Sequence, residues 1–158
     1  MAWLEIIAHG NLPRDYRRHT RRHVIHLPGD RSMSHALILL AHGSSDARWR
    51  APFETLEHDL RARLETPAVL AYMELSEPSL ETRVAELYDQ GHRRLDILPL
   101  FFAAGRHLRQ DVPDQLEALR AQYPQTTLTL LDPVGQHPAF VEALAGIVTA
   151  RAEAPAEQ

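Results

Sequence analysis

Short apolar runs alternate with amphipathic segments four times along the chain. The apolar runs, typical of strands that are buried on both faces of a sheet, cover residues 36–41, 68–73, 95–102 and 126–131. The amphipathic segments, in which apolar residues recur at helical spacing, cover residues 53–64, 78–88, 112–119 and 138–148. Proline or glycine marks most of the boundaries, as expected where helices begin and end. The pattern predicts four strand–helix units.

The spacing of these units predicts the fold class. Successive strands begin about 30 residues apart, which is the length of a β–α–β unit. Because such crossovers join parallel strands, we expect an α/β domain: a four-stranded parallel sheet with helices on both faces, a flavodoxin-like three-layer sandwich. The four units share no side-chain motif, which argues against a repeat protein.

The first 32 residues differ from the rest of the chain. They contain six arginines and three acidic residues, a net charge of +3, which leaves −7 for residues 33–158 out of the total of −4. This basic, poorly periodic segment predicts a disordered arm or a start site assigned upstream of Met33. The domain is expected to span residues 33–152, with residues 153–158 forming a frayed tail.

Composition excludes several functions. The 158 residues include no cysteine, and all 17 basic residues are arginine. Thiolate metal sites, cysteine nucleophiles, Schiff-base lysines and Walker A loops are therefore excluded. The net charge argues against nucleic-acid binding, and no run is long enough for a membrane span or signal peptide, so we expect a cytoplasmic protein. Ten histidines are the main supply of transition-metal ligands.

Chemically useful residues follow the predicted strands. In parallel sheets, ligands bind at the carboxyl ends of the strands. His42 follows the first strand, Glu74 follows the second, and His107 lies in the segment after the third. Two imidazoles and a carboxylate at one rim suit a divalent transition metal. Each of these residues also has an ordinary structural explanation: either histidine can be a hydrogen-bonded loop residue, and Glu74 can cap the following helix. The segment Gly43–Ser45 can likewise be a simple turn and helix cap.

Other α/β enzyme classes do not fit. A histidine-nucleophile phosphatase needs an arginine directly before its histidine, and Ala41 stands there. No Gly-x-Ser-x-Gly elbow exists for an α/β-hydrolase, and no Gly-x-Gly-x-x-Gly turn exists for a dinucleotide. Composition and spacing alone leave the function open.

Three segments carry a family likeness. Residues 39–44 (LLAHGS), 72–80 (YMELSEPSL) and 98–113 (LPLFFAAGRHLRQDVP) resemble the small CbiX/SirB-type sirohydrochlorin chelatases, the class II chelatases. The likeness runs in order from about residue 34 to 150, and the third segment is the most specific. Residues 135–138 (GQHP) also resemble the family's segment after the fourth strand. Residues 1–32 have no counterpart in the family.

The resemblance implies a function and a set of site residues. It implies insertion of cobalt or iron into sirohydrochlorin without ATP, in cobalamin or siroheme biosynthesis, with the divalent metal as substrate and no permanent cofactor. His42 and His107 match the family's metal-binding histidines, and Glu74 matches its acidic residue at the same rim. The alternative is a non-catalytic relative of the same fold that binds or delivers the tetrapyrrole or the metal.

The resemblance also implies how the macrocycle is held. Sirohydrochlorin carries eight carboxylates, which arginine is suited to clamp. The expected substrate contacts are Ser44, Ser45, Phe101, Phe102, Arg106 and Arg109, with Arg48 and Arg50 as further candidates near the His42 loop. Because short family members look like half of a two-domain chelatase, a homodimer with the macrocycle between subunits is expected.

Overall fold

A computed structural model of the chain describes residues 34–153. The predicted arm (1–32) and the last residues of the predicted tail (154–158) lie outside the described residues. No helix within the described range is both long and apolar enough to cross a membrane.

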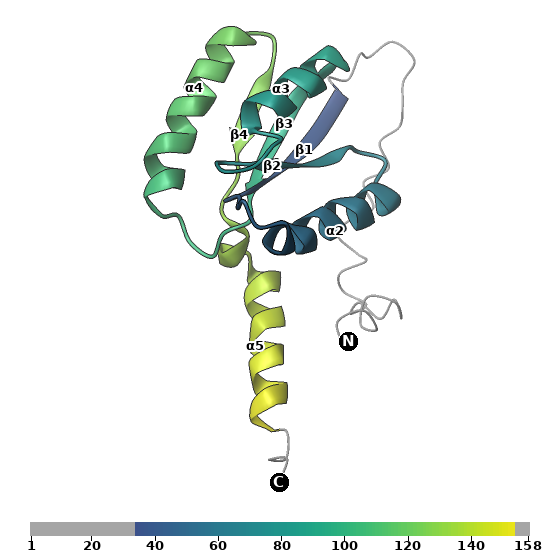
Figure 1. Ribbon diagram of the computed structural model, residues 1–158, viewed down its shortest axis with the longest axis vertical. Coiled ribbons are helices and arrows are strands. Elements are labelled where there is room, and N and C mark those ends of the chain that lie inside the picture. Colours follow the sequence, from purple (N-terminus) through teal and green to yellow (C-terminus); the bar gives the residue numbers. More distant parts are fainter. Residues whose placement is uncertain (1–33, 154–158) are drawn as a thin grey trace. The chain divides into compact units, whose positions relative to one another are not determined.

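The centre of the domain is a four-stranded parallel sheet (Figure 1). Its strands are β1 (Ser34–Ala41), β2 (Ala68–Tyr72), β3 (His92–Pro99) and β4 (Thr127–Leu130). Their order across the sheet is β2-β1-β3-β4, so β1 and β3 are central. The predicted fold class is confirmed.

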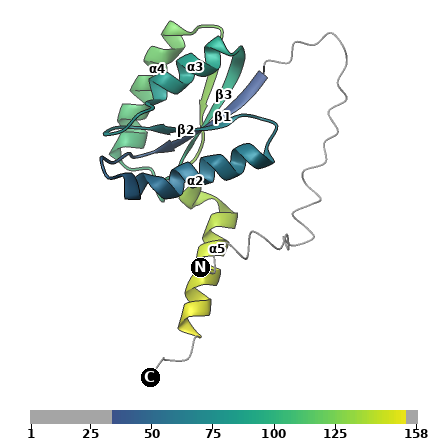
Figure 2. The ribbon, with the colours of Figure 1, turned by 45° about the vertical axis from the view of Figure 1, so that its right-hand side comes forward.

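The handedness of parallel crossovers decides which face of the sheet each connecting helix covers. They are α2 (Ala47–Arg63), α3 (Leu80–Asp89), the π-helical turn η2 (His107–Asp111), α4 (Val112–Gln122), the short 3-10 turn η3 (Val134–Gln136) and α5 (Pro138–Ala152). The step from β1 to β2 runs one way across the sheet, and the next two steps run the other way. Right-handed connections therefore place α2 on one face and α3 and α4 on the other (Figure 2).

The two faces of the sheet are covered unequally. The α3/α4 face holds the larger core, in which alternate strand residues pack against three buried residues from each helix. The α2 face holds a small cluster of buried strand residues, flanked by Phe53 and Leu60 of α2. Helix α2 itself buries no residue. The core thus lies mainly on one side of the sheet.

The structure adds three details to the sequence prediction. Helix α2 begins at Ala47 and contains Pro52, because Asp46 caps it by accepting a hydrogen bond from the Arg48 N–H. Strand β3 ends at Pro99, so the last three residues of the predicted run leave the sheet. The predicted helix that begins at Pro138 forms as α5, and none of its residues is buried within the described domain.

Candidate functional site

Backbone pairing beyond β1 and β2 places the first two candidate residues side by side. The Met73 N–H donates to the Ala41 carbonyl at 3.0 Å, and the Glu74 N–H donates to the His42 carbonyl at 3.1 Å. Parallel register is thus kept for one residue past the ends of both strands. As a result, the His42 Nδ1 lies 3.4 Å from the Glu74 Oε1.

Gly43 permits this close approach. Its φ is +101°, a conformation that L side chains rarely adopt. A side chain at this position would overlap the backbone carbonyl of Glu74. The glycine after His42 is therefore required for the two strand ends to meet. The interpretation of Gly43–Ser45 as a simple turn did not predict this role.

The third candidate residue joins the same rim. The His42 and His107 ring centroids are 5.7 Å apart, with the ring planes at 90°. The side chains of His42, Glu74 and His107 are each about half exposed. The structure therefore brings together all three residues that the sequence singled out. Within residues 34–153, no group of three or more histidine, aspartate or glutamate side chains is arranged so that it could hold a metal ion by itself.

His107 is held by a residue that sequence reasoning missed. Its Nδ1 lies 2.7 Å from the Asp111 Oδ2. Both residues belong to the π-turn η2, in which the Val112 N–H donates to the His107 carbonyl five residues earlier. Such turns are frequent at functional sites. The spacing of four residues between His107 and Asp111 was the available signal, because it places two side chains on one helical face.

The two imidazoles share one arrangement. Each has its Nδ1 next to a carboxylate, Glu74 for His42 and Asp111 for His107. A carboxylate at one ring nitrogen fixes the ring orientation and makes the other nitrogen a better metal ligand. The contact is a hydrogen bond for His107, at 2.7 Å, and an ion-pair distance of 3.4 Å for His42, and within residues 34–153 neither Nε2 has a hydrogen-bond partner.

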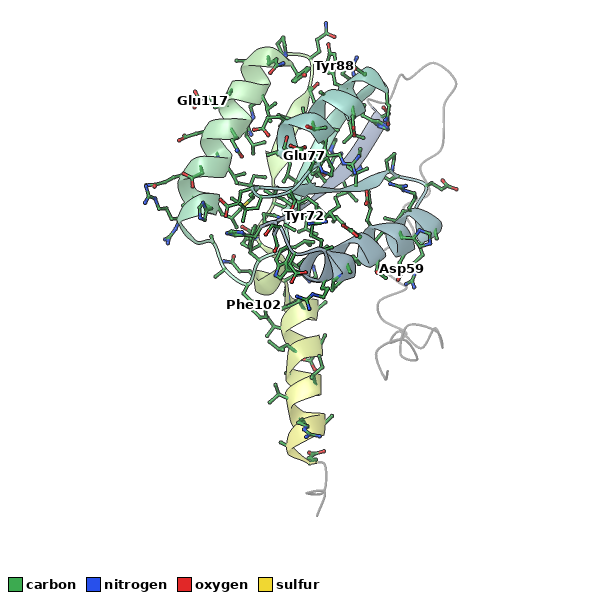
Figure 3. All side chains as sticks on the ribbon, in the orientation of Figure 1. Asp59, Tyr72, Glu77, Tyr88, Phe102 and Glu117 are labelled. Carbon is green, nitrogen blue, oxygen red and sulfur yellow. The ribbon has the colours of Figure 1, made fainter. Side chains whose placement is uncertain are left out.

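One apolar side chain contacts His42, and two others are exposed in the loops that carry Glu74 and His107. Phe101 is half-buried against the core, with its ring edge-on to His42 at 6.4 Å between centroids. Phe102 is 66% exposed, and Leu75 is 69% exposed with a left-handed φ of 59°. Figure 3 shows Phe102 near the start of α5, at the opposite end of the domain from Tyr88. Sequence reasoning missed Leu75, since a lone leucine in a loop carries no pattern.

The predicted arginines occupy different settings. Arg106 and Arg109 line an open depression of about 590 Å³ together with Gln110, whose Oε1 accepts a hydrogen bond from the Arg106 Nε. Arg48 binds Asp46 and holds the pKa of that carboxyl below its usual value. Arg50 donates to the Ser44 carbonyl at 2.8 Å. Arg106 and Arg109 thus border open space, whereas Arg48 and Arg50, in the first turn of α2, have partners in the loop that precedes the helix.

The two predicted serines also differ in their surroundings. The Ser44 N–H donates to the Ser76 Oγ, whose hydroxyl in turn donates to the Ser44 carbonyl, and the Ser44 Oγ accepts from the Asp46 N–H. These bonds lock the loop after β1 to the loop after β2. Ser45 is exposed. Ser44 therefore has a structural role in this loop, and Ser45 is the serine that stands open.

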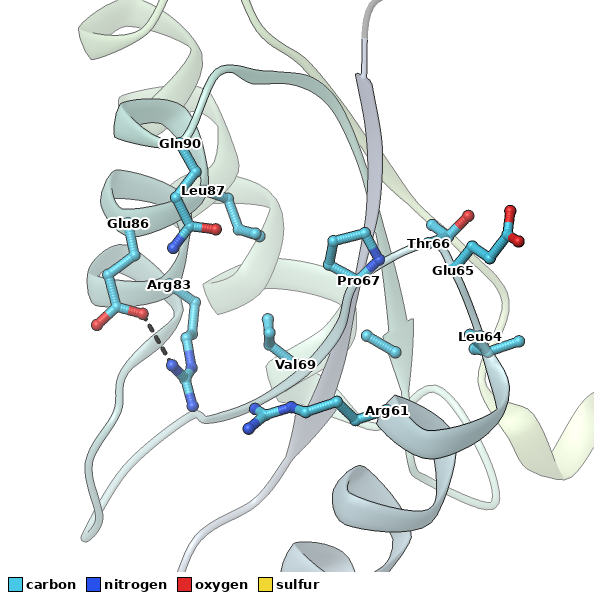
Figure 4. Close-up of a pocket in the computed structure, with 11 residues that line it drawn as sticks. Arg61, Leu64, Glu65, Thr66, Pro67, Val69, Arg83, Glu86, Leu87 and Gln90 are labelled. Atoms are coloured by element: carbon cyan, nitrogen blue, oxygen red, sulfur yellow. Dashed lines mark hydrogen bonds and ion pairs between the residues drawn. The ribbon is translucent and has the colours of Figure 1, made fainter.

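A second depression lies away from the rim. It has a volume of about 360 Å³ and is lined by residues of the α2 and α3 C-terminal ends and the start of β2 (Figure 4). Both of its arginines have carboxylate partners: Arg83 binds Glu86 at 2.8 Å, and Arg61 binds Glu57, outside the lining, at 3.2 Å. Neither histidine of the pair lines this pocket.

The four-stranded parallel sheet and its helices define a class of α/β proteins, the chelatase-like fold. Residues 36–150 match the CbiX family, and the chain belongs to that family. The chain is similar to the sirohydrochlorin cobaltochelatase of Sulfolobus acidocaldarius, with 27% identity covering 68% of this chain and 85% of the relative. It is also similar to the sirohydrochlorin ferrochelatase of Bacillus subtilis, with 23% identity over 71% of this chain.

Solved structures agree with this assignment. A CbiX protein from Marinobacter aquaeolei VT8 matches with a TM-score of 0.68 and 46% identity, over 75% of this chain and 98% of that chain. The cobalt complex of the chelatase SirB from Bacillus subtilis subspecies spizizenii matches in fold with a TM-score of 0.66 at 22% identity. The chain covers 51% of that SirB chain and 43% of the Bacillus subtilis ferrochelatase, about half of each.

Substitution of Gly43 tests the strand-end geometry. We expect Gly43→Ala to destabilise the domain more than Gly91→Ala and to disrupt the rim, because the new side chain meets the Glu74 carbonyl. Gly91 is the matched control: it also has a positive φ, of 93°, but open space around it, so it should cost about 1–2 kcal/mol. Urea unfolding of both variants measures the difference. Equal losses would contradict the role given to the close approach.

Proposed function

We propose that the protein inserts divalent cobalt or iron into sirohydrochlorin without ATP, in cobalamin or siroheme biosynthesis. The observation that carries the proposal is the pairing of His42 with His107, each with its Nδ1 beside a carboxylate and its Nε2 free. Family membership and relatives named sirohydrochlorin cobaltochelatase and ferrochelatase support the same reaction.

The histidine pair is suited to hold an ion briefly. Insertion requires the ion to lose water and then pass to the four ring nitrogens. Neutral imidazoles bind divalent cobalt and iron well enough to replace part of the water shell. Because the pair stands at an open, half-exposed rim, further coordination positions stay available to the macrocycle. The site thus favours transfer over storage.

Glu74 is placed to handle protons. Each insertion releases two N–H protons from the macrocycle as the metal takes their place. The Glu74 side chain is about half exposed, and one of its oxygens lies beside the His42 Nδ1, which leaves the other oxygen available. A carboxylate at this position can accept a pyrrole proton while it orients the imidazole.

The surroundings of the pair suit a flat, polyanionic macrocycle. Phe101, Phe102 and Leu75 offer apolar surface at the rim. Arg106 and Arg109 border the open depression next to His107, where guanidinium groups can bind carboxylates in bidentate fashion. In this proposal Ser45 adds a hydroxyl from the loop after β1, and Ser44 maintains the loop that carries it.

One rim encloses half of such a ligand. Binding sites usually cover most of a ligand's surface, whereas this rim is open on one side. A second copy related by a two-fold axis would cover the other side with the same residues. The approximately double length of the Bacillus chains is consistent with two such units around one macrocycle. We therefore include a homodimer in the proposal.

Metal insertion by histidine variants tests the reaction. Anaerobic mixing of the protein with sirohydrochlorin and Co²⁺ or Fe²⁺ should produce the absorbance change of the metallated ring. We expect His42→Ala and His107→Ala each to reduce the rate at least 100-fold, and the double variant to be little worse than either, because the residues act as a unit. His58→Ala, an exposed histidine of α2, is the control.

Binding of the macrocycle without any metallation by the native chain would instead favour a delivery protein. Additive losses in the double variant would mean that the two histidines serve separate steps.

Asp111 substitutions test the support given to His107. We expect Asp111→Ala to raise the KM for Co²⁺ about 10- to 100-fold, the usual effect of removing a carboxylate that orients a ligating histidine. Asp111→Asn keeps an acceptor for the ring N–H and should lose less. Asp114→Ala, exposed in the first turn of α4, is the control. An unchanged KM in Asp111→Ala would contradict the positioning role.

Stoichiometry tests the shared site. Titration of sirohydrochlorin into protein of known concentration should saturate at one macrocycle per two chains, since two rims face one ligand. Light scattering on the same sample should give the mass of a dimer. Saturation at one macrocycle per chain, with a monomer mass, would refute the shared site and leave the metal chemistry of one rim intact.

A further inference from the structure

Two residues with left-handed backbone occupy equivalent positions in the loops after β1 and β2. The hydrogen bonds that join these loops link residues 32 positions apart, in the pairs Ala41–Met73, His42–Glu74 and Ser44–Ser76. Gly43 and Leu75 form the remaining pair at this offset, and their φ values are +101° and 59°. Both loops therefore turn at the same place, directly after the residues that carry the candidate chemistry.

The conformation of Leu75 is unusual for its residue type. It is the one non-glycine residue between positions 34 and 153 with a positive φ. Leucine is strained there because its Cβ approaches the neighbouring backbone, whereas glycine adopts this conformation freely. The leucine side chain gains little packing within the domain, since it is 69% exposed, more than any other large apolar side chain of the described chain. Strained residues of this kind cluster at functional sites, and the exposed side chain points to a contact outside the chain.

Hydrogen bonds on both sides hold Leu75 in place. Before it, the Glu74 N–H donates to the His42 carbonyl at 3.1 Å. After it, the Ser76 hydroxyl accepts from the Ser44 N–H at 3.1 Å and donates to the Ser44 carbonyl at 2.7 Å. Both anchors belong to the loop after β1, so the position of Leu75 is fixed relative to His42.

We propose that Leu75 contacts the flat face of the macrocycle and that Ser76 is the positioning residue that holds Leu75 in its left-handed conformation. This inference rests on the proposed function and adds two residues to it. A macrocycle that receives a metal ion from His42 has to lie over the His42–Glu74 pair, and Leu75 is the next residue in the chain. An apolar side chain suits the face of the ring, whereas the carboxylates at its edge require polar partners.

Removal of the side chain separates its contact from its backbone conformation. Because glycine adopts a positive φ without strain, Leu75→Gly should unfold in urea at the native midpoint or above it. Its Kd for metal-free sirohydrochlorin, measured by absorbance titration, should rise about 10-fold, as expected for the loss of one apolar contact. Leu75→Met keeps an apolar side chain and should bind the macrocycle almost as tightly as the native chain.

Leu64→Gly is the matched control. Leu64 is also an exposed leucine, at 42%, but it ends α2 with a φ of −112°. This substitution should lower the urea midpoint and leave the Kd for sirohydrochlorin unchanged. Equal Kd values for Leu75→Gly and the native chain would overturn the proposal. A loss of dimer mass in Leu75→Gly that accounts for its weaker binding would also overturn it, because Leu75 would then contact a second copy.

Kinetics separate a contact with the ring from a disturbance of the metal-binding pair. Ser76→Ala should raise the KM for sirohydrochlorin, as Leu75→Gly does, with little change in the KM for Co²⁺, and Ser76→Thr should restore the native values. The control, Ser79→Ala, removes the cap that accepts the Thr82 N–H at the start of α3 and should leave both KM values unchanged. A raised KM for Co²⁺ in Ser76→Ala would overturn the positioning role, because the hydroxyl would then act on His42 and Glu74.

A double variant tests whether Ser76 acts through Leu75. Leu75→Gly with Ser76→Ala should bind sirohydrochlorin about as weakly as Leu75→Gly alone, and additive losses would overturn this dependence. The Kd is measured without metal, so it is independent of insertion. A native chain that binds the macrocycle and does not metallate it contradicts the proposed reaction, while the Kd comparison still decides the role of Leu75. A native chain that does not bind the macrocycle overturns both.

Discussion

Continued parallel pairing between β1 and β2 is the constraint on which the site depends. The bond from the Glu74 N–H to the His42 carbonyl carries the register one residue beyond the sheet. It brings the two side chains within 3.4 Å, and Gly43 makes the approach sterically possible. Without this register, a histidine and a glutamate 32 positions apart would have no reason to meet. The arrangement of the candidate site therefore begins with backbone hydrogen bonds.

His107 reaches the same rim by a different route. It follows β3 after a loop and sits on a π-turn, where Asp111 holds its ring by a 2.7 Å hydrogen bond. The π-turn leads directly into α4, which begins at Val112 and has Pro113 in its first turn. The two histidines thus have equivalent carboxylate partners but are supported differently, one by the sheet and the other by a local turn.

The two faces of the sheet differ in how much they bury. The α3/α4 face holds the large buried core, whereas neither α2 nor α5 buries a residue. On the α2 face, the strand residues away from α2 are mixed in polarity: Leu98 of β3 is half-buried, and Thr127 and Thr129 of β4 are exposed. The stability of the domain therefore comes mainly from the α3/α4 side.

The sequence by itself determined the fold class and the rim residues, because apolar runs report which segments are buried and parallel strands end at one edge. It placed His42, Glu74 and His107 there correctly. It did not reveal Asp111 as a partner of His107 or Leu75 as an exposed rim residue, because both depend on loop conformation. It predicted the helix from Pro138 but not that α5 would bury no residue, since periodicity records that a helix is apolar but not which surface covers it. Only the tertiary structure decided those points. It shows the conformation of each loop, and it shows that no element of the described domain covers α5.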